Sequence, residues 1–125
     1  MKTNMTVLLI ALISIVFSVA AQFCLKAGMS SGHIRMAMEA KLSIQGVVAL
    51  ISSPYIIAGF MLYGMGAMIW LAVLARWDVS KAYPLVGFGF VLAALIGLIQ
   101  GENISFLRIA GIVLIVGGVA VVART

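Results

Sequence analysis

The sequence predicts an all-α membrane protein with four transmembrane helices, an interfacial segment before the second helix, and assembly into a dimer. Of its 125 residues, 65% are hydrophobic and only 9% are charged, whereas a soluble domain has about 25% charged residues. A soluble fold of this length buries only about two-thirds of its surface, so it could not hide so many apolar side chains. The charges also lie between long uncharged runs, and a membrane span needs about 20 apolar residues.

Three of the uncharged runs each predict one span. Thr3–Leu25 and Ala82–Gly101 match a span in length. Ile109–Ala123 is shorter, but it reaches span length if the helix starts near Phe106 and Arg108 extends its charge to the interface. The predicted helices, in a single domain over 1–125, are about 4–26, 54–75, 80–99 and 105–123.

The remaining run, Leu42–Ala75, is too long for one span and too short for two, and Pro54 divides it. Proline suits the first turn of a helix and disrupts the interior. Pro54 therefore starts the second span, and Leu42–Ser53 forms an interfacial helix or loop. The more polar Ala27–Lys41 is expected to be a surface connection. A signal peptide is the alternative for the first run, but that run exceeds the usual core of about 7–15 residues and three further spans follow.

The basic residues predict no orientation, because the positive-inside rule finds the two sides equal. One predicted side of the membrane carries Lys2, Arg76, Lys81 and Arg124. The other side carries Lys26, Arg35, Lys41 and Arg108. Either the chain inserts both ways and forms an antiparallel dimer, or one or two lysines lie within the membrane for function. In the fourth helix, Gly111 and Gly118 lie seven residues apart on one face and are the predicted dimer interface.

The composition excludes several classes of function. The basic residues are scattered singly, so no basic stripe indicates nucleic-acid binding. One Cys and one His argue against a metal centre, and no cofactor is expected. The acids Glu39, Asp78 and Glu102 all lie in predicted loops, and no acid–base pair suited to catalysis is visible. Transport or a packing role is therefore favoured over an enzymatic one.

The first predicted helix carries a polar stripe, because Ser18, Gln22 and Lys26 recur every four residues on one face. Polar groups within a membrane are costly and usually functional. Lysine binds phosphate as a point charge, so the stripe favours an anionic head group over an organic cation. The alternative is that Lys26 only extends to the interface and Gln22 hydrogen-bonds a neighbouring helix.

A second polar cluster opens the third predicted helix. Asp78 and Ser80 are residue types that cap helix N-termini, and Lys81 and Tyr83 follow directly. A helix N-terminus with a nearby lysine suits an anion. The alternative is an ordinary capped helix start with a tyrosine at the interface.

The same helix contains residues that predict a hinge. Pro84 lies about one turn into the helix, and Gly87 and Gly89 follow. Trp70 and Trp77 flank the preceding loop and are predicted to anchor the chain at the membrane interface.

Six short segments form an ordered pattern over nearly the whole chain. They are AAQFCLK at 20–26, SPYIIAG at 53–59, WLAVL at 70–74, AYP at 82–84, GE at 101–102 and GIVLIVGGV at 111–119. Together they resemble four-helix members of the drug/metabolite transporter superfamily. Two groups fit this resemblance: the small multidrug resistance exporters, which are antiparallel homodimers, and the EamA-like flippase subunits that move undecaprenyl-phosphate aminoarabinose for lipid A modification. The segment at 20–26 is more similar to the flippase subunits.

One departure separates these two groups. The exporters carry a glutamate eight residues before the lysine that corresponds to Lys26, and here Ser18 stands at that position. The tryptophan that they place in helix three appears as Val86. The resemblance therefore implies an inner-membrane flippase, or flippase subunit, for an undecaprenyl-phosphate-linked sugar, an aminosugar for lipid A or envelope glycan modification. A proton-coupled exporter of small cations or metabolites is the first alternative, and a non-transporting membrane subunit is the second.

This interpretation assigns roles to the polar residues. Lys26 and Lys81 attract the phosphate of a lipid-linked anionic substrate, and Gln22, Ser18 and Tyr83 line a path for the sugar. Four helices are too few to enclose a path, so the expected partner is a similar four-helix subunit, in a homodimer or a heterodimer. The expected location is the bacterial inner membrane. The role considered for Glu102 is to cap the fourth helix.

Overall fold

The computed structural model describes residues 5–39 and 44–125, and within these ranges it is helical with no strand. The elements in chain order are α1 (Met5–Met29), α2 (Gly32–Glu39), α3 (Ile44–Ser52), α4 (Pro54–Leu74), α5 (Val79–Ala82), the 3-10 helix η1 (Tyr83–Val86), α6 (Gly87–Ile99) and α7 (Phe106–Ala123). Lys2 and Lys41 of the predicted charge count lie outside the described residues.

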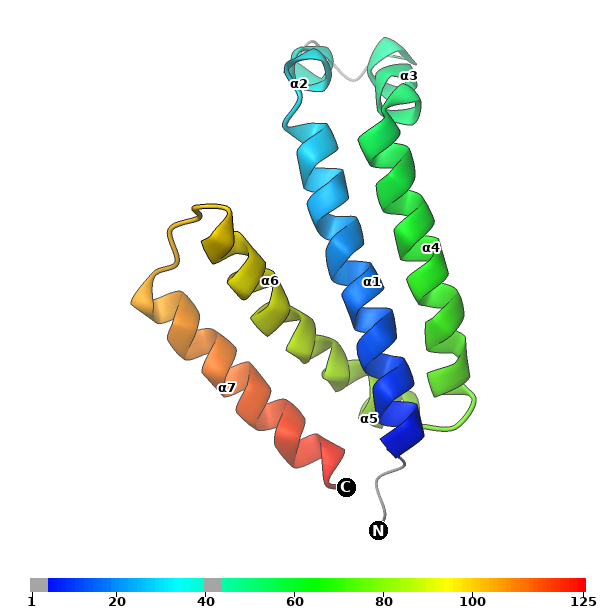
Figure 1. The fold of residues 1–125 in the computed structure, drawn as a ribbon, viewed down its shortest axis with the longest axis vertical. Helices are drawn as coiled ribbons and strands as arrows, with labels where there is room; N and C mark the ends of the chain where they lie inside the picture. Colours follow the sequence, from blue (N-terminus) through cyan, green and yellow to red (C-terminus); the bar gives the residue numbers. More distant parts are fainter. Residues whose placement is uncertain (1–4, 40–43) are drawn as a thin grey trace.

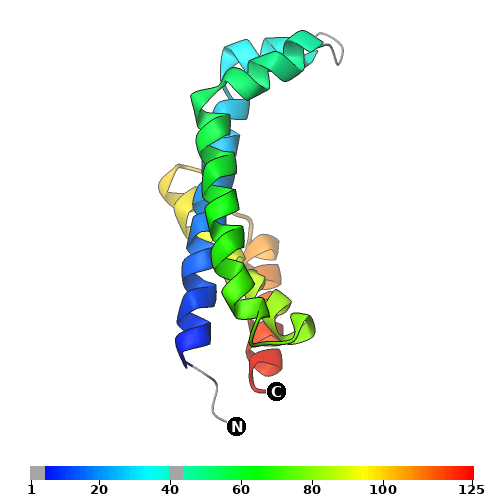
Figure 2. The same ribbon diagram turned by 90° about the vertical axis from the view of Figure 1, so that its right-hand side faces the viewer.

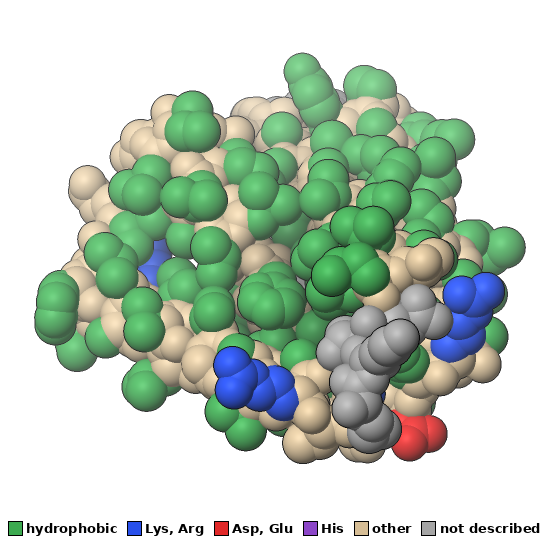
Figure 3. All heavy atoms as spheres, turned by 60° about the horizontal axis from the view of Figure 1, so that its bottom comes forward, with side chains coloured by type: hydrophobic (Ala, Val, Ile, Leu, Met, Phe, Trp, Pro, Cys, Tyr) green, Lys and Arg blue, Asp and Glu red, His purple; other side chains and the backbone are tan. Residues whose placement is uncertain are grey.

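Four segments are long and apolar enough to cross a membrane, which confirms the predicted all-α, four-span class. They are α1, α4, the α5–η1–α6 segment Val79–Ile99, and α7. Large apolar side chains stay exposed over these helices, and in Figure 3 they cover much of the visible surface while the Lys and Arg side chains lie apart from one another. A surface of this kind suits contact with lipid.

The helices form two antiparallel pairs. α1 packs along α4, and the pair formed by α6 and α7 is inclined to them (Figure 1). The N-terminal end of α1, the short α5 and the C-terminal end of α7 lie at the same end of the molecule (Figure 1). α2 and α3 lie across the opposite ends of α1 and α4 (Figure 2).

The connection between the first two spans is more helical than expected. α3 corresponds to the predicted interfacial segment, but α1 continues to Met29 and α2 occupies most of the stretch predicted as a surface connection. Ile34 of α2 is buried, and α2 packs against α3. An eight-residue helix is marginal by itself, so this tertiary contact, which local sequence does not reveal, stabilises α2.

The contact between α1 and α4 repeats every seven residues. Buried residues of α1 include Val7, Ser14, Ala21 and Gly28, and buried residues of α4 include Gly59, Gly66 and Val73. A seven-residue repeat keeps the same faces of two helices together at a shallow crossing angle. Most of these residues are small, which lets membrane helices approach closely.

Two glycines of α4 show how close this approach is. A Cβ atom added at Gly66 would lie 3.1 Å from the carbonyl oxygen of Ser14, and one added at Gly59 would lie 3.2 Å from that of Ala21. In both places the neighbouring atom belongs to the backbone of α1, which cannot move aside as a flexible side chain could. The Ser14 hydroxyl also donates a buried hydrogen bond of 2.6 Å to the carbonyl oxygen of Gly66.

The third span changes helix type at Pro84. The segment Tyr83–Val86 is a 3-10 helix between α5 and α6, in keeping with the missing N–H of proline. A Cβ added at Gly87 would lie 2.7 Å from Val119 of α7, and one added at Gly89 would lie 3.2 Å from Ile15 of α1. Both glycines therefore hold the third span close to its neighbours, and the hinge that they predict with Pro84 stays a prediction.

We expect Gly66→Leu to destabilise the protein by about 1–3 kcal/mol, the usual cost of overpacking a tight contact. The added side chain would push against the backbone of α1. Gly64→Leu is the matched control, because a Cβ at Gly64 meets no atom within 4 Å. Unfolding of both variants by a denaturing detergent measures the difference, and equal stability would contradict the close contact between α1 and α4.

Candidate functional site

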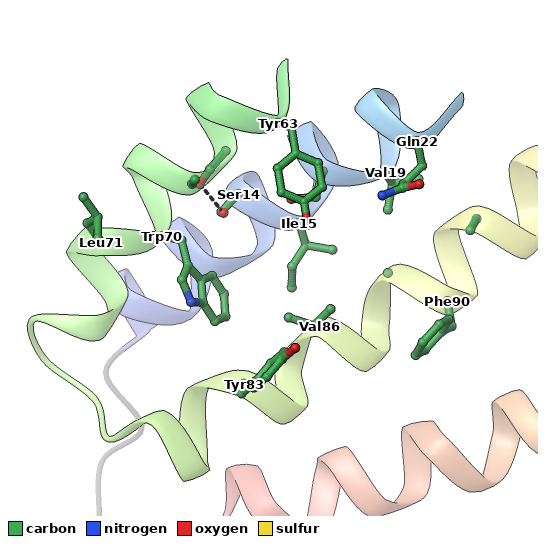
Figure 4. A pocket seen from close by; sticks show the side chains of 15 residues that line it. Ser14, Ile15, Val19, Gln22, Tyr63, Trp70, Leu71, Tyr83, Val86 and Phe90 are labelled. Atoms are coloured by element: carbon green, nitrogen blue, oxygen red, sulfur yellow. Dashed lines mark hydrogen bonds between the residues drawn. The ribbon is translucent and has the colours of Figure 1, made fainter. Parts of the chain in front are cut away.

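A cavity of about 630 Å³ lies between α1, α4 and the η1–α6 segment, a volume in the usual range for ligand sites. Figure 4 shows Tyr63, Trp70 and Tyr83 around the space between these helices, with Ile15 and Val86 beside them. Most of the wall is apolar. The residues with polar side-chain atoms are Ser14, Ser18, Gln22, Tyr63, Trp70 and Tyr83.

The structure brings three of the predicted substrate-binding residues together in this cavity. Ser18 and Gln22 come from α1, and Tyr83 comes from η1. Within the described ranges, Gln22 forms no hydrogen bond to a neighbouring helix, and its role in substrate binding stays a prediction. The hydroxyl of Ser18 likewise has no protein partner there, whereas Ser14 is committed to Gly66. Within the described chain, no protein group therefore uses the donors and acceptors of the Ser18 and Gln22 side chains.

Two aromatic residues of the cavity were not predicted as part of a site. Tyr63 is not among the predicted site residues, and Trp70 is predicted to be an interface anchor, yet both line the cavity. Their spacing contains a signal, because Tyr63, Gly66 and Trp70 recur at three and four residues and so share one face of α4. The glycine at the centre of this face allows α1 to approach.

A second cavity, of about 380 Å³, contains Lys26. It lies between α1, α6 and α7, and it shares Gln22, Phe90 and Ala93 with the first cavity. The two cavities are therefore neighbours, and polar residues of α1 lead from one to the other. Glu102 and Arg108 also line the second cavity, and neither was predicted as a site residue.

Backbone geometry at the end of α6 places Glu102. Gly101 has a φ of +88°, which favours glycine. The N–H groups of Glu102 and Gly101 donate to the carbonyl oxygens of Gly97 and Leu98, at 2.9 and 3.1 Å, and this pattern is the Schellman motif that ends many helices. The turn brings the Glu102 carboxylate over Gly97, and a Cβ atom added at Gly97 would displace that carboxylate.

The start of α7 places Arg108. Ser105 is the N-cap, and its hydroxyl accepts a hydrogen bond of 3.2 Å from the backbone N–H of Arg108. The expectation that Glu102 caps this helix is therefore wrong, because Ser105 fills that role. The Arg108 guanidinium donates one hydrogen bond of 3.5 Å to the carbonyl oxygen of Asn103. The structure shows no ion pair among Lys26, Glu102 and Arg108, all of which lie in its described part.

Lys81 lies apart from both cavities. Its Nζ atom is 4.5 Å from the ring centroid of Trp77, a cation–π contact, and it lines neither cavity. Asp78 occupies the N-cap of α5, but its side chain forms no capping hydrogen bond. The structure therefore does not place Lys81 beside Lys26, and a contact of Lys81 with substrate stays a prediction.

The glycines of the predicted dimer interface face open space. A Cβ added at Gly111 or Gly118 would meet no atom of the described chain within 4 Å, and α7 contributes only Val119 to the buried residues. This face is free for another helix, and the dimer interface stays a prediction.

Comparison with known proteins finds several relatives that share one description. A protein of Pseudomonas paraeruginosa described as a probable 4-amino-4-deoxy-L-arabinose-phosphoundecaprenol flippase subunit ArnE is 33% identical over 84 residues, which are 66% of this chain and 73% of the relative. Proteins with the same description are 38% identical in Pseudomonas savastanoi pv. phaseolicola, over 63% of this chain and 70% of the relative, and 44% identical in Pseudomonas syringae pv. syringae, over 49% and 57%.

The chain belongs to the ArnE family of flippase subunits. Membership identifies it as a membrane transport protein rather than an enzyme, and with the four spans it indicates a multi-pass protein of the bacterial inner membrane. No family model matches the chain, and no solved structure matches it. The resemblance to the flippase subunits is confirmed, whereas membership of the wider superfamily stays a prediction.

We expect the two serines of α1 to differ in their effect on stability. Ser14→Ala removes the buried hydrogen bond to Gly66 and should lower stability by about 1 kcal/mol. Ser18→Ala should change it by less than about 0.5 kcal/mol, because that hydroxyl has no protein partner to lose. Unfolding in mixed detergent micelles measures both, and a loss for Ser18→Ala equal to that for Ser14→Ala would contradict this division of roles.

Proposed function

We propose that the chain is one subunit of a flippase that moves undecaprenyl phosphate carrying 4-amino-4-deoxy-L-arabinose across the inner membrane, for modification of lipid A. The observation that carries the proposal is the placement of Lys26 at the end of a polar stripe that runs along two neighbouring cavities. The description of the relatives as flippase subunits for this lipid supports it.

The stripe suits a phosphate joined to a sugar. The ammonium group of Lys26 supplies a point charge for the phosphate. Ser18 and Gln22, which have no hydrogen-bond partners within the described chain, supply donors and acceptors for sugar hydroxyls. Tyr63 and Tyr83 add phenolic hydroxyls from the other walls of the first cavity. The apolar lipid tail needs no such path, because it can remain in the bilayer.

The charges of the spans disfavour the alternative of a proton-coupled cation exporter. The four spans contain no Asp or Glu, so no carboxylate within membrane depth is available to bind protons and cations in turn. The proposed substrate needs a cation for its phosphate, and Lys26 meets that need.

We further propose that α7 joins the chain to a second four-helix subunit. A homodimer and a heterodimer both fit, and the word subunit in the description of the relatives supports a partner. The open face at Gly111 and Gly118 offers small residues for close helix contact.

Substitution of Lys26 tests the proposed substrate contact. In proteoliposomes that hold the chain with its partner subunit, an amine-reactive reagent that cannot cross the membrane measures arrival of the lipid in the outer leaflet. We expect Lys26→Ala to slow flipping about tenfold, the effect of losing one charge-assisted hydrogen bond, and Lys26→Arg to retain most of the rate. Lys81→Ala measures separately the contribution predicted for Lys81. Flipping by Lys26→Ala at the full rate would exclude a phosphate contact at that residue.

Substitution on α7 tests the proposed assembly. We expect the double variant Gly111→Leu and Gly118→Leu to lose co-purification with the partner subunit or the second copy, because the larger side chains separate the helices. Gly117→Leu adds one such side chain about 100° around the helix from Gly118 and should retain assembly. Assembly of the double variant at the normal level would place the interface elsewhere.

A further inference from the structure

We propose that the second cavity is a subsite for a zwitterionic head group, in which Lys26 and Arg108 bind the phosphate and Glu102 binds the protonated amine of the sugar. This inference rests on the proposed function and deepens it, because it names the residue that distinguishes an aminosugar from a neutral one. Three observations carry it.

The first observation is that the cavity carries charges of both signs without neutralising them. Lys26, Glu102 and Arg108 line one space of about 380 Å³, yet within the described chain none forms an ion pair with another. A ligand with only a phosphate would leave the carboxylate unpaired beside it. A ligand with a phosphate and an ammonium group satisfies all three side chains.

The second observation is that the backbone fixes the position of Glu102. The Schellman turn at Gly101 ties the Glu102 N–H to the Gly97 carbonyl oxygen, and the carboxylate lies over Gly97 because that residue has no side chain. No other acid lines either cavity. The turn therefore fixes the backbone position from which the single carboxylate of the site extends, which reduces part of the entropic cost of binding.

The third observation is that Arg108 retains free donors. Its backbone N–H donates to the hydroxyl of Ser105, and its guanidinium donates one hydrogen bond to the Asn103 carbonyl oxygen. A guanidinium has five N–H donors in a planar fork that matches phosphate oxygens. Lys26 approaches the same space from α1, so the two cations come from helices on different sides of the cavity.

Equilibrium binding of two radiolabelled lipids tests the proposal, with the chain and its partner subunit in nanodiscs. One lipid is undecaprenyl phosphate 4-amino-4-deoxy-arabinose, and the other is its N-acetylated analogue, which keeps the phosphate and loses the positive charge. We expect Glu102→Gln to weaken binding of the amine lipid about tenfold and to leave binding of the N-acetylated lipid unchanged. Asp78→Asn, which removes an acid outside both cavities, should change neither.

A second variant separates position from charge. Gly97→Ala keeps the carboxylate but displaces it, so we expect it to weaken binding of the amine lipid selectively as well. Unchanged preference for the amine lipid in Glu102→Gln, or equal weakening of both lipids, would overturn the role of Glu102.

The cation variants test the proposed function separately. Lys26→Ala and Arg108→Ala should weaken both lipids alike, because both lipids carry the phosphate. If neither cation variant weakens either lipid, the phosphate contacts of the proposal fail, whatever Glu102 does. If the cation variants behave as expected and Glu102→Gln keeps the preference for the amine lipid, only the present inference fails.

Discussion

The close contact of α1 with Gly59 and Gly66 of α4 is the constraint on which the rest of the structure depends. Because the contact is made by backbone and repeats every seven residues, it fixes both the register and the rotation of α1. The rotation of α1 decides which of its side chains contact α4 and which face the cavity. Ser14 is used in the contact, whereas Ser18 and Gln22 lie at its margin and reach the cavity. The contact with Gly59 and Gly66 of α4 thus determines which way the polar stripe of α1 faces.

The third span closes the cavity through a second set of close contacts. Gly89 brings α6 against Ile15 of α1, and Gly87 brings the same helix against Val119 of α7. The two helix pairs are inclined to one another (Figure 1), so they meet near the termini and separate toward the loop between α6 and α7. The buried core lies at the closed end, around Val7, Val73 and Leu85. The polar stripe runs from this end toward Lys26 and the open end.

The sequence predicts the spans well, because the cost of a charge in lipid determines where they end. Uncharged runs and Pro54 place all four helices within a few residues of their observed bounds.

The sequence predicts the candidate site less well, because a site depends on which helix faces meet. Ser18, Gln22 and Lys26 were recognisable from their spacing on one helix. The spacing of residues does not indicate Glu102 as a site residue. Its place over Gly97 follows from a turn whose geometry depends on a single residue, Gly101. The sequence also does not predict helix α2, because a tertiary contact with α3 stabilises it.

The position of the charges reconciles an apolar chain with the charged substrate that we propose. A carboxylate in the middle of a span would cost several kcal/mol unless it were paired, and the four spans contain none. Glu102 and Arg108 instead belong to the short connection between α6 and α7 and to the first turn that follows it, where water reduces this cost. The second cavity brings both within reach of Lys26 near the end of α1. The chain can therefore present a carboxylate and two cations to a zwitterionic head group without burying an unpaired acid in the bilayer. The proposed function then leaves the first cavity, with its serines, glutamine and tyrosines, for the uncharged hydroxyls of the sugar.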